Sequence, residues 1–301
     1  MNSSSRLAGV IAAAATPLRP DFTPDLERLA MHCRKLLDGG CDGINLLGTT
    51  GEATAFSVEQ RLAVMRGIVE AGLPMARFMV GTGVCALEDT VRLTRAACEL
   101  GFCGALVLPP FYYPDISAAG LVAYVDELVA RVGDDRLALY LYHIPQNTGV
   151  PWPVEVVAEL KAKHPRALVG LKDSAGDLAD ARAVARAVAD FDVVPSSEAA
   201  LGHASADGFA GCISATTNLT ARHAQAAWSG QGTEAGRAAV KKAGELRAIV
   251  AGHPLIAAVK SALATRYDDP AWAGVALPLQ PLAAEARARL DAALGAREAL
   301  P

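Results

Sequence analysis

Eight short apolar runs recur along the first 214 residues of this chain, and most of the segments between them show the periodicity of amphipathic helices. Within the runs the hydrophobic residues are continuous rather than alternating, which is typical of parallel strands buried on both faces. Parallel strands need helical crossovers, so the pattern restricts the chain to alternating β/α architectures. The runs are 10–15, 43–47, 77–80, 104–108, 137–142, 168–171, 192–194 and 208–214.

This alternation predicts a (β/α)8 TIM barrel, a fold that needs about 250 residues as one domain. Beyond Thr220 the pattern is helical as far as Pro301, which is longer than one closing helix requires. We therefore expect the barrel to occupy residues 1–220. A closing helix and a C-terminal extension of two or three helices should occupy residues 221–301.

A doubly wound sheet is the structural alternative. Its dinucleotide-binding version carries G-x-G-x-x-G after the first strand. Here the first run continues into Thr16-Pro17, and the nearest candidate, Gly81-Thr82-Gly83, lacks the third glycine. The sequence also contains no G-K-[ST] phosphate loop. These features favour the barrel. A nicotinamide-dependent barrel reductase is a possible alternative function, but the sequence lacks the phosphate-binding signature of such an enzyme.

Three helix starts can be located from their capping residues. Thr23 is a candidate N-cap with Pro24 at the first helical position. Ser57 and Gln60 have the spacing of a capping box, and Ser117 can cap the helix after the fourth run.

Composition narrows the possible partners. The net charge of -4 comes from 28 basic and 32 acidic residues without long blocks of one sign, which argues against a nucleic-acid surface. No apolar run approaches the roughly 18 residues of a membrane span, and the N-terminus lacks a signal-peptide pattern. The six cysteines and six histidines show no metal-ligand spacing. We expect a cytoplasmic protein with a small-molecule partner, no metal and no cofactor.

Lys172 stands at the end of the sixth run, directly after Ala167–Leu171. An amine at the end of a buried strand is short of water, and a neutral amine can attack a carbonyl carbon to form a Schiff base. Lys172 is therefore a candidate nucleophile. The alternative is a lysine that extends from the strand end and only closes a loop.

Other candidates follow from the rule that active sites of this barrel lie at the C-terminal ends of its strands. The second run ends in Gly48-Thr49-Thr50-Gly51-Glu52, where two hydroxyls and several amide groups could bind a small carboxylate. An ordinary polar turn is the alternative. The fourth run ends in the aromatic segment 109–114, and the fifth in Tyr142-His143-Ile144-Pro145.

Together these motifs resemble the dihydrodipicolinate synthase and N-acetylneuraminate lyase superfamily in order and spacing. The motifs are Gly48–Glu52, Tyr142 before Ile144-Pro145, and Gly170–Gly176, and the resemblance extends from Gly9 to about Pro281. It implies a class I, Schiff-base aldolase or dehydratase that acts on pyruvate or another 2-oxo acid.

The resemblance also implies roles for individual residues. Lys172 would form the imine, and the Tyr142 phenol would carry protons during imine formation and carbon–carbon bond chemistry. Thr49 and Thr50 would bind the pyruvyl carboxylate and relay protons, with Thr50 counted among the catalytic residues. Gly51 would belong to the same carboxylate-binding turn.

Two further roles are implied for more distant parts of the chain. Tyr112 would be the tyrosine that one subunit supplies to the proton relay of its neighbour, in a homotetramer built as a dimer of dimers. The backbone at Ile213 would face the substrate.

The chain departs from the synthase pattern where the second substrate binds. Asn147 occupies the place of an arginine that grips a substrate carboxylate, and an amide cannot form the same charge-assisted fork. His143 stands where asparagine is common, and Ser196 with Glu198 replaces a Gly/Asp pattern. With Asn147, Ser196 and Glu198 as substrate-binding residues, we expect a neutral, hydroxyl-rich aldehyde and a poor reaction with aspartate semialdehyde.

The sequence thus predicts a lyase that cleaves or dehydrates a 2-keto-3-deoxy sugar acid or a related compound, with pyruvate as the keto product. One alternative is a dihydrodipicolinate synthase that condenses pyruvate with aspartate semialdehyde. Another is a catalytically silent homologue that binds a 2-oxo acid. The presence of Lys172, Tyr142 and Thr50 together weighs against the silent homologue, because binding alone needs no proton relay.

Overall fold

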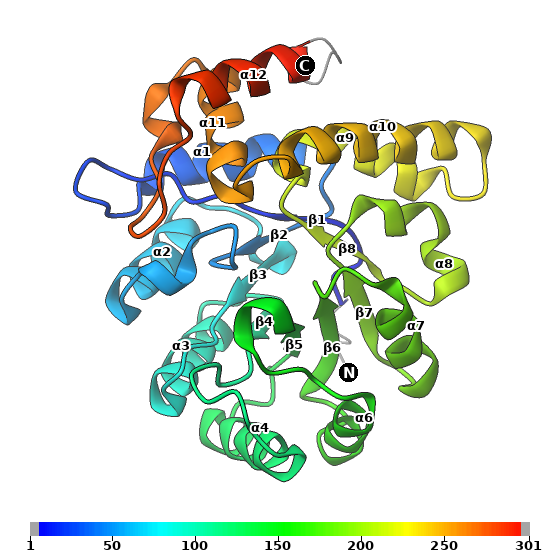
Figure 1. The fold of residues 1–301 in the computed structure, drawn as a ribbon. Coiled ribbons are helices and arrows are strands. Elements are labelled where there is room, and N and C mark those ends of the chain that lie inside the picture. Colours follow the sequence, from blue (N-terminus) through cyan, green and yellow to red (C-terminus); the bar gives the residue numbers. More distant parts are fainter. Residues whose placement is uncertain (1–5, 296–301) are drawn as a thin grey trace.

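The computed structural model describes residues 6–295, and these form a parallel eight-stranded barrel (Figure 1). The strands pair in the order β7-β6-β5-β4-β3-β2-β1-β8, and a parallel bridge between Val193 and Phe209 links β7 to the segment before β8. All eight predicted strands are confirmed, with ends shifted by three residues at most. They are β1 Gly9–Ala13, β2 Gly43–Leu46, β3 Phe78–Gly81, β4 Gly104–Val107, β5 Leu139–His143, β6 Leu168–Asp173, β7 Asp192–Pro195 and β8 Gly211–Ser214.

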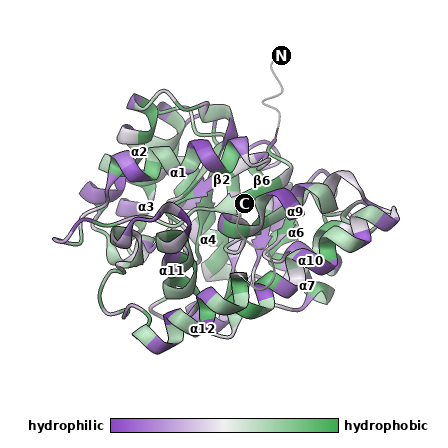
Figure 2. Cartoon of the chain, turned by 90° about the horizontal axis from the view of Figure 1, so that it is seen from above, coloured by the Kyte–Doolittle hydropathy of each residue, from purple (hydrophilic) through white to green (hydrophobic). Residues whose placement is uncertain are grey.

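Helices follow the strands and form the outer layer of the barrel. Figure 2 shows hydrophilic and hydrophobic residues alternating along the outer helices, so one side of each helix can pack inward. The helices of the barrel are α1 Leu26–Asp38, α2 Val58–Glu70, α3 Leu87–Glu99, α4 Ala118–Val132, α5 Pro145–Thr148, α6 Val154–Lys163, α7 Leu178–Ala187, α8 Ala204–Asp207 and α9 Thr217–Ser229. Short 3-10 helices are η1 Ala53–Ala55, η2 Met75–Arg77, η3 Glu198–His203 and η4 Pro270–Ala273.

Two of the three predicted helix starts are confirmed. Ser57 forms the capping box of α2 with Gln60, and Ser117 caps α4. The prediction for α1 is wrong, because its N-cap is Asp25 rather than Thr23. One oxygen of Asp25 accepts from the backbone N–H of Arg28 at 3.0 Å and the other from the Arg28 guanidinium at 2.6 Å. An aspartate that makes both bonds is a stronger cap than a threonine.

The C-terminal helical extension is also confirmed. After α9, which packs on β1, the chain forms α10 Glu234–Ala251, α11 Leu255–Tyr267 and α12 Ala284–Gly295. Figure 1 shows these helices along one side of the barrel, next to α1 and α9. Residue 220, where we divided barrel from extension, lies inside α9. Across residues 6–295 no single helix is long and apolar enough to cross a membrane, and α10 with α11 meets that requirement only as a pair bent by 109°.

A bulge in β6 sets the register that matters for the site. Leu139 pairs with Leu168, but Tyr140 pairs with Gly170, so one extra residue of β6 is accommodated between them. The ring of Tyr140 fills the space beside Gly170, where an added Cβ would lie 2.5 Å from it. From there the register runs on unchanged, and Tyr142 pairs with Lys172.

A buried ion pair fastens the extension to the loop after β2. Lys260 of α11 donates to Glu52 at 2.5 Å, and the backbone N–H of Ala276 donates to the other carboxylate oxygen at 2.6 Å. Both charged side chains are almost completely excluded from solvent. Glu52 itself has a left-handed backbone, with φ of 56°, at the end of the Gly48–Glu52 turn. The extension therefore holds the turn that carries Thr49 and Thr50.

We expect Lys260→Met to lower the free energy of unfolding by about 3–5 kcal/mol, because it leaves the Glu52 carboxylate buried without a cation. Urea unfolding followed by circular dichroism measures this. The double variant Glu52→Gln/Lys260→Met removes both charges and should recover most of the loss. Equal stability of the Lys260→Met variant and the unmodified protein would show that the pair does not hold the turn.

Candidate active site

A cavity of about 500 Å³ opens at the C-terminal ends of the barrel strands. Its walls come from the loops after β2, β5, β6, β7 and β8 and from α10, α11 and the segment after η4. The C-terminal extension therefore forms part of the site and not only its support. Seven of the residues proposed from the sequence line this cavity: Thr49, Thr50, Tyr142, Asn147, Lys172, Ser196 and Ile213.

Lys172, Tyr142 and Thr49 form a continuous chain of hydrogen bonds in the cavity. The Lys172 ammonium donates to the Tyr142 hydroxyl at 3.2 Å and lies 4.3 Å from the centre of its ring. The same hydroxyl is 3.1 Å from the Thr49 hydroxyl. Lys172 is only 3% exposed, yet it reaches the cavity surface. An amine and a phenol held this way can share the nucleophilic and proton-transfer steps of imine chemistry.

The environment of Tyr142 suits a group that releases and takes up a proton. Burial alone raises the pKa of the phenol. The charge of Lys172, together with hydrogen bonds involving Thr49, Ser174 and Lys172 itself, outweighs burial and lowers the pKa below its ordinary value. The phenol is therefore more readily ionised than an isolated tyrosine, which helps it act as a base.

The two threonines of the Gly48–Glu52 turn occupy different positions. Thr49 makes the hydrogen bond to the phenol, whereas Thr50, which we assigned to catalysis, is a buried residue of the cavity wall. Gly51 is not among the described lining residues, and its carbonyl accepts a hydrogen bond from Thr16 at 2.9 Å. An added Cβ at Gly51 would lie 3.0 Å from the Ala14 carbonyl, so the turn packs closely on the chain after β1.

Tyr112 lies away from this cavity. It is 75% exposed in the loop between β4 and α4, where its ring packs edge-on against Tyr113 at 5.3 Å. Within residues 6–295 it makes no contact that would join it to Tyr142.

Arg247 of α10 is a charged cavity residue that sequence reasoning missed. It lies on a helix whose buried positions, such as Ala243, Leu246 and Val250, predict only an amphipathic packing face. Nothing in the sequence distinguishes Arg247 from the other basic residues of α10, such as Arg237.

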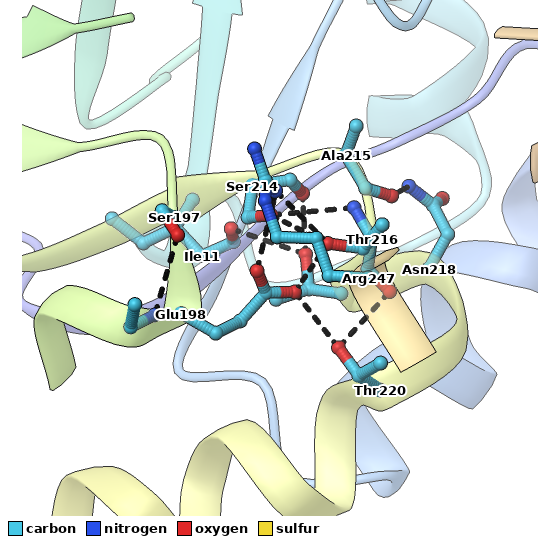
Figure 3. A network of polar contacts seen from close by, with 11 residues as sticks. Ile11, Ser197, Glu198, Ser214, Ala215, Thr216, Asn218, Thr220 and Arg247 are labelled. Atoms are coloured by element: carbon cyan, nitrogen blue, oxygen red, sulfur yellow. Dashed lines mark hydrogen bonds and ion pairs between the residues drawn. The ribbon is translucent and has the colours of Figure 1, made fainter. Parts of the chain in front are cut away.

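Glu198 holds Arg247 in place instead of lining the cavity. Its side chain is completely buried, and Figure 3 shows it within a network of polar contacts around Arg247. The guanidinium lies 3.3 Å from the Glu198 carboxylate. We proposed Glu198 as a direct substrate contact, but its described contacts position an arginine.

Arg247 also overturns one premise of the sequence analysis. Aspartate semialdehyde was expected to react poorly because no arginine was available to neutralise a second carboxylate. Asn147 does replace the arginine of the synthase motif, but a guanidinium enters the same cavity from α10. The cause is tertiary packing, which brings residue 247 into the same cavity as Lys172, although the two are 75 positions apart in the chain.

Comparison with known proteins agrees with this geometry. The model of the dihydrodipicolinate synthetase family matches residues 6–297. The "Uncharacterized DapA-like lyase" of Chloroflexus aurantiacus is 36% identical over 95% of both chains. The 4-hydroxy-tetrahydrodipicolinate synthase of Methanoculleus marisnigri is 33% identical over 70% of this chain and 72% of its own.

Solved structures show the same fold. Dihydrodipicolinate synthase from Agrobacterium tumefaciens superimposes with a TM-score of 0.88 at 28% identity, over 96% of this chain and 98% of its own. N-acetylneuraminate lyase from Proteus mirabilis gives a TM-score of 0.87 at 24% identity, over 98% of this chain and all of its own. The latter likeness concerns the fold alone.

Fold and site therefore define a class I, Schiff-base lyase built on a TIM barrel. The chain belongs to the dihydrodipicolinate synthetase family. This membership favours an enzyme over a silent homologue that only binds a 2-oxo acid.

We expect Tyr142→Phe to slow imine formation between pyruvate and the protein by about 10²- to 10⁴-fold, the usual contribution of a positioned proton-transfer group. The rate of imine formation is measured by quenching samples with borohydride at intervals and determining the fraction of modified protein by mass spectrometry. The matched control is Tyr124→Phe, because the Tyr124 hydroxyl donates to Thr90 outside the cavity. An unchanged rate in Tyr142→Phe would remove the phenol from the reaction.

Proposed function

We propose that this protein acts on a 2-keto-3-deoxy sugar acid or a related 2-oxo acid through an imine at Lys172, and that it either cleaves this substrate to pyruvate and an aldehyde or removes water from it. The chain of hydrogen bonds from Lys172 through Tyr142 to Thr49 is the observation that carries the proposal. Simple binding of a 2-oxo acid would not need a buried amine paired with a phenol.

The reaction begins when the neutral amine of Lys172 attacks the 2-oxo carbon. The carbonyl oxygen takes up two protons in turn and leaves as water, which produces the imine. The Tyr142 phenol, 3.2 Å from the amine, gives and receives these protons and exchanges them with Thr49. Thr50 is proposed to help hold the carboxylate next to the 2-oxo group.

Bond cleavage uses the imine as an electron sink. In the aldolase reaction, the C4 hydroxyl loses its proton, the bond between C3 and C4 breaks, and its electron pair forms an enamine while C4 becomes an aldehyde carbon. Tyr142 is placed to accept that proton. Protonation of the enamine and hydrolysis of the imine then release pyruvate and the free amine.

The cavity supports a substrate with several hydroxyl groups. Its wall carries uncharged hydrogen-bonding side chains that a sugar-derived chain could engage, among them Gln146, Asn147, Ser174 and Ser196. Its volume of about 500 Å³ is within the usual range for pockets that enclose a small organic ligand.

Condensation of pyruvate with aspartate semialdehyde is the second candidate. Arg247 favours it, because the guanidinium could bind the carboxylate of that aldehyde. Several curated relatives bear the name of the synthase, including the Methanoculleus marisnigri protein. The Chloroflexus aurantiacus protein, which matches over 95% of its length, is named only as a lyase.

Two assays separate these candidates. The first measures pyruvate release from a panel of 2-keto-3-deoxy acids, and the second measures pyruvate consumption with aspartate semialdehyde. We expect kcat/KM for the best 2-keto-3-deoxy acid to exceed that for aspartate semialdehyde by about 10-fold, because Arg247 enters the cavity from α10 and so replaces the arginine of the synthase motif, absent at Asn147, only in part. Asn147→Arg should narrow the gap. A preference of the unmodified protein for aspartate semialdehyde would establish the synthase reaction instead.

The proposed assembly is a homotetramer made of two dimers, in which Tyr112 extends the proton relay of the neighbouring subunit. The exposure of Tyr112 and its neighbour Tyr113 supports this, because each leaves more than 70% of a large apolar side chain uncovered in the single chain. One solved structure of the same fold is that of a monomeric dihydrodipicolinate synthase variant, so the assembly needs its own test. The cytoplasmic location also stays a prediction.

Mixing inactive Tyr112→Phe and Lys172→Ala chains tests whether Tyr112 acts in the site of the neighbouring subunit. If Tyr112 acts in the neighbouring site, mixed dimers contain one site with both residues, and part of the activity should return. Sedimentation of labelled chains verifies that subunits exchange. Full activity in a monomeric protein, or no rescue despite proven exchange, would contradict the proposal.

A further inference from the structure

We propose that Arg247 forms a second anion-binding subsite in the catalytic cavity and that it takes a carboxylate at the distal end of the 2-oxo acid. The substrate would then be a 2-oxo diacid, or in the condensing direction an aldehyde that carries a carboxylate. This inference rests on the proposed function, because it assumes that the 2-oxo group reacts at Lys172.

The guanidinium of Arg247 is held at one of its nitrogens, Nη1. Its Nη1 atom lies 3.3 Å from Glu198 Oε2 and donates to the hydroxyls of Ser214 and Thr216, both at 3.1 Å. Ser214 ends β8 and follows Ile213, a residue of the cavity wall. Anchoring of this kind removes side-chain freedom before a ligand arrives, so less entropy is lost on binding.

Glu198 is itself held firmly on the side away from the cavity. Its second carboxylate oxygen accepts from the Thr216 hydroxyl at 2.6 Å and from the Thr220 hydroxyl at 2.9 Å, as Figure 3 shows. The carboxylate is completely buried and is not among the described lining residues. Part of its charge is therefore satisfied behind the cavity wall, while the arginine faces the cavity.

The other edge of the guanidinium remains available to a ligand. An arginine has five N–H donors, and a carboxylate binds best across two of them in parallel. The hydrogen bonds that Arg247 makes to the described residues all leave from Nη1, so Nε and Nη2 can form that fork. The side chain is 30% exposed, which is enough for contact with a ligand in the cavity.

The charges around the cavity match an anion with two acidic groups. Lys172 and Arg247 are the basic residues of its described wall, and no aspartate or glutamate stands among the lining residues of the described chain. A ligand whose 2-oxo group reacts at Lys172 could place its first carboxylate at Thr50 and its second at Arg247. The hydroxyl and amide side chains of the wall would meet the part of the ligand between them.

A matched pair of probes tests the subsite without knowledge of the physiological substrate. 2-Oxoadipate and 2-oxohexanoate have the same chain length and 2-oxo group, but only 2-oxoadipate has a distal carboxylate. Competition against pyruvate for borohydride-trapped imine gives their relative affinities. We expect the unmodified protein to favour 2-oxoadipate by about 10- to 100-fold, the range of a charge-assisted hydrogen bond in a binding equilibrium.

Variants then assign the preference to Arg247. Arg247→Gln should reduce the ratio between the two probes to near one, and Arg247→Lys should keep part of it. Arg247→Gln leaves the Glu198 carboxylate buried without a cation, which could destabilise the fold. The double variant Glu198→Gln/Arg247→Gln removes that carboxylate as well and provides a second test. Arg237→Gln is the matched control, since Arg237 is an exposed arginine of the same helix that bonds the Gly232 carbonyl.

The outcomes separate this inference from the proposed function. No trapped adduct with pyruvate or either probe would overturn the proposed function itself. Trapping of both probes with equal affinity in the unmodified protein would overturn the subsite alone. A preference for 2-oxoadipate that survives in the double variant would also overturn it, because another group would then bind the carboxylate.

Discussion

The pairing of Tyr142 on β5 with Lys172 on β6 is the constraint on which the site depends. Both side chains enter the barrel from neighbouring strands at the same level, because a bulge in β6 fixes the register before them. A register shifted by one residue would turn Lys172 away from the barrel axis. The Tyr140 ring, packed where Gly170 has no side chain, fills the interior below and supports that register. The chemistry of the site thus begins with the packing of the barrel core.

The C-terminal helices form part of the cavity that opens at the ends of the barrel strands. One buried ion pair, between Lys260 and Glu52, fastens α11 to the turn that presents Thr49 to the phenol. A second pair, between the half-buried Arg247 and the buried Glu198, holds a guanidinium of α10 in the cavity. Buried ion pairs contribute little net stability, but loss of one partner is costly, so such pairs hold segments in one arrangement. Here both pairs act on the walls of the same cavity.

The sequence predicted the parts of this structure that local pattern determines. Continuous apolar runs identified all eight strands, and Lys172 was recognisable because it ends such a run within a family motif. Thr49 and Thr50 are adjacent, so only the fold could show which of them meets the phenol. The sequence did not predict Arg247 as a cavity residue, because its position depends on tertiary contacts with Ser214 and Glu198 that produce no periodic pattern in the sequence.

The central claim is that Lys172 is the residue that forms the imine. The most direct test is treatment of the unmodified protein with pyruvate and borohydride, followed by digestion and mapping of the adduct. The account predicts one pyruvyl group per chain on the peptide that contains Lys172, and no modification at Lys260, which is equally buried but paired with Glu52. An adduct on any other lysine, or one that persists in Lys172→Ala, would contradict it.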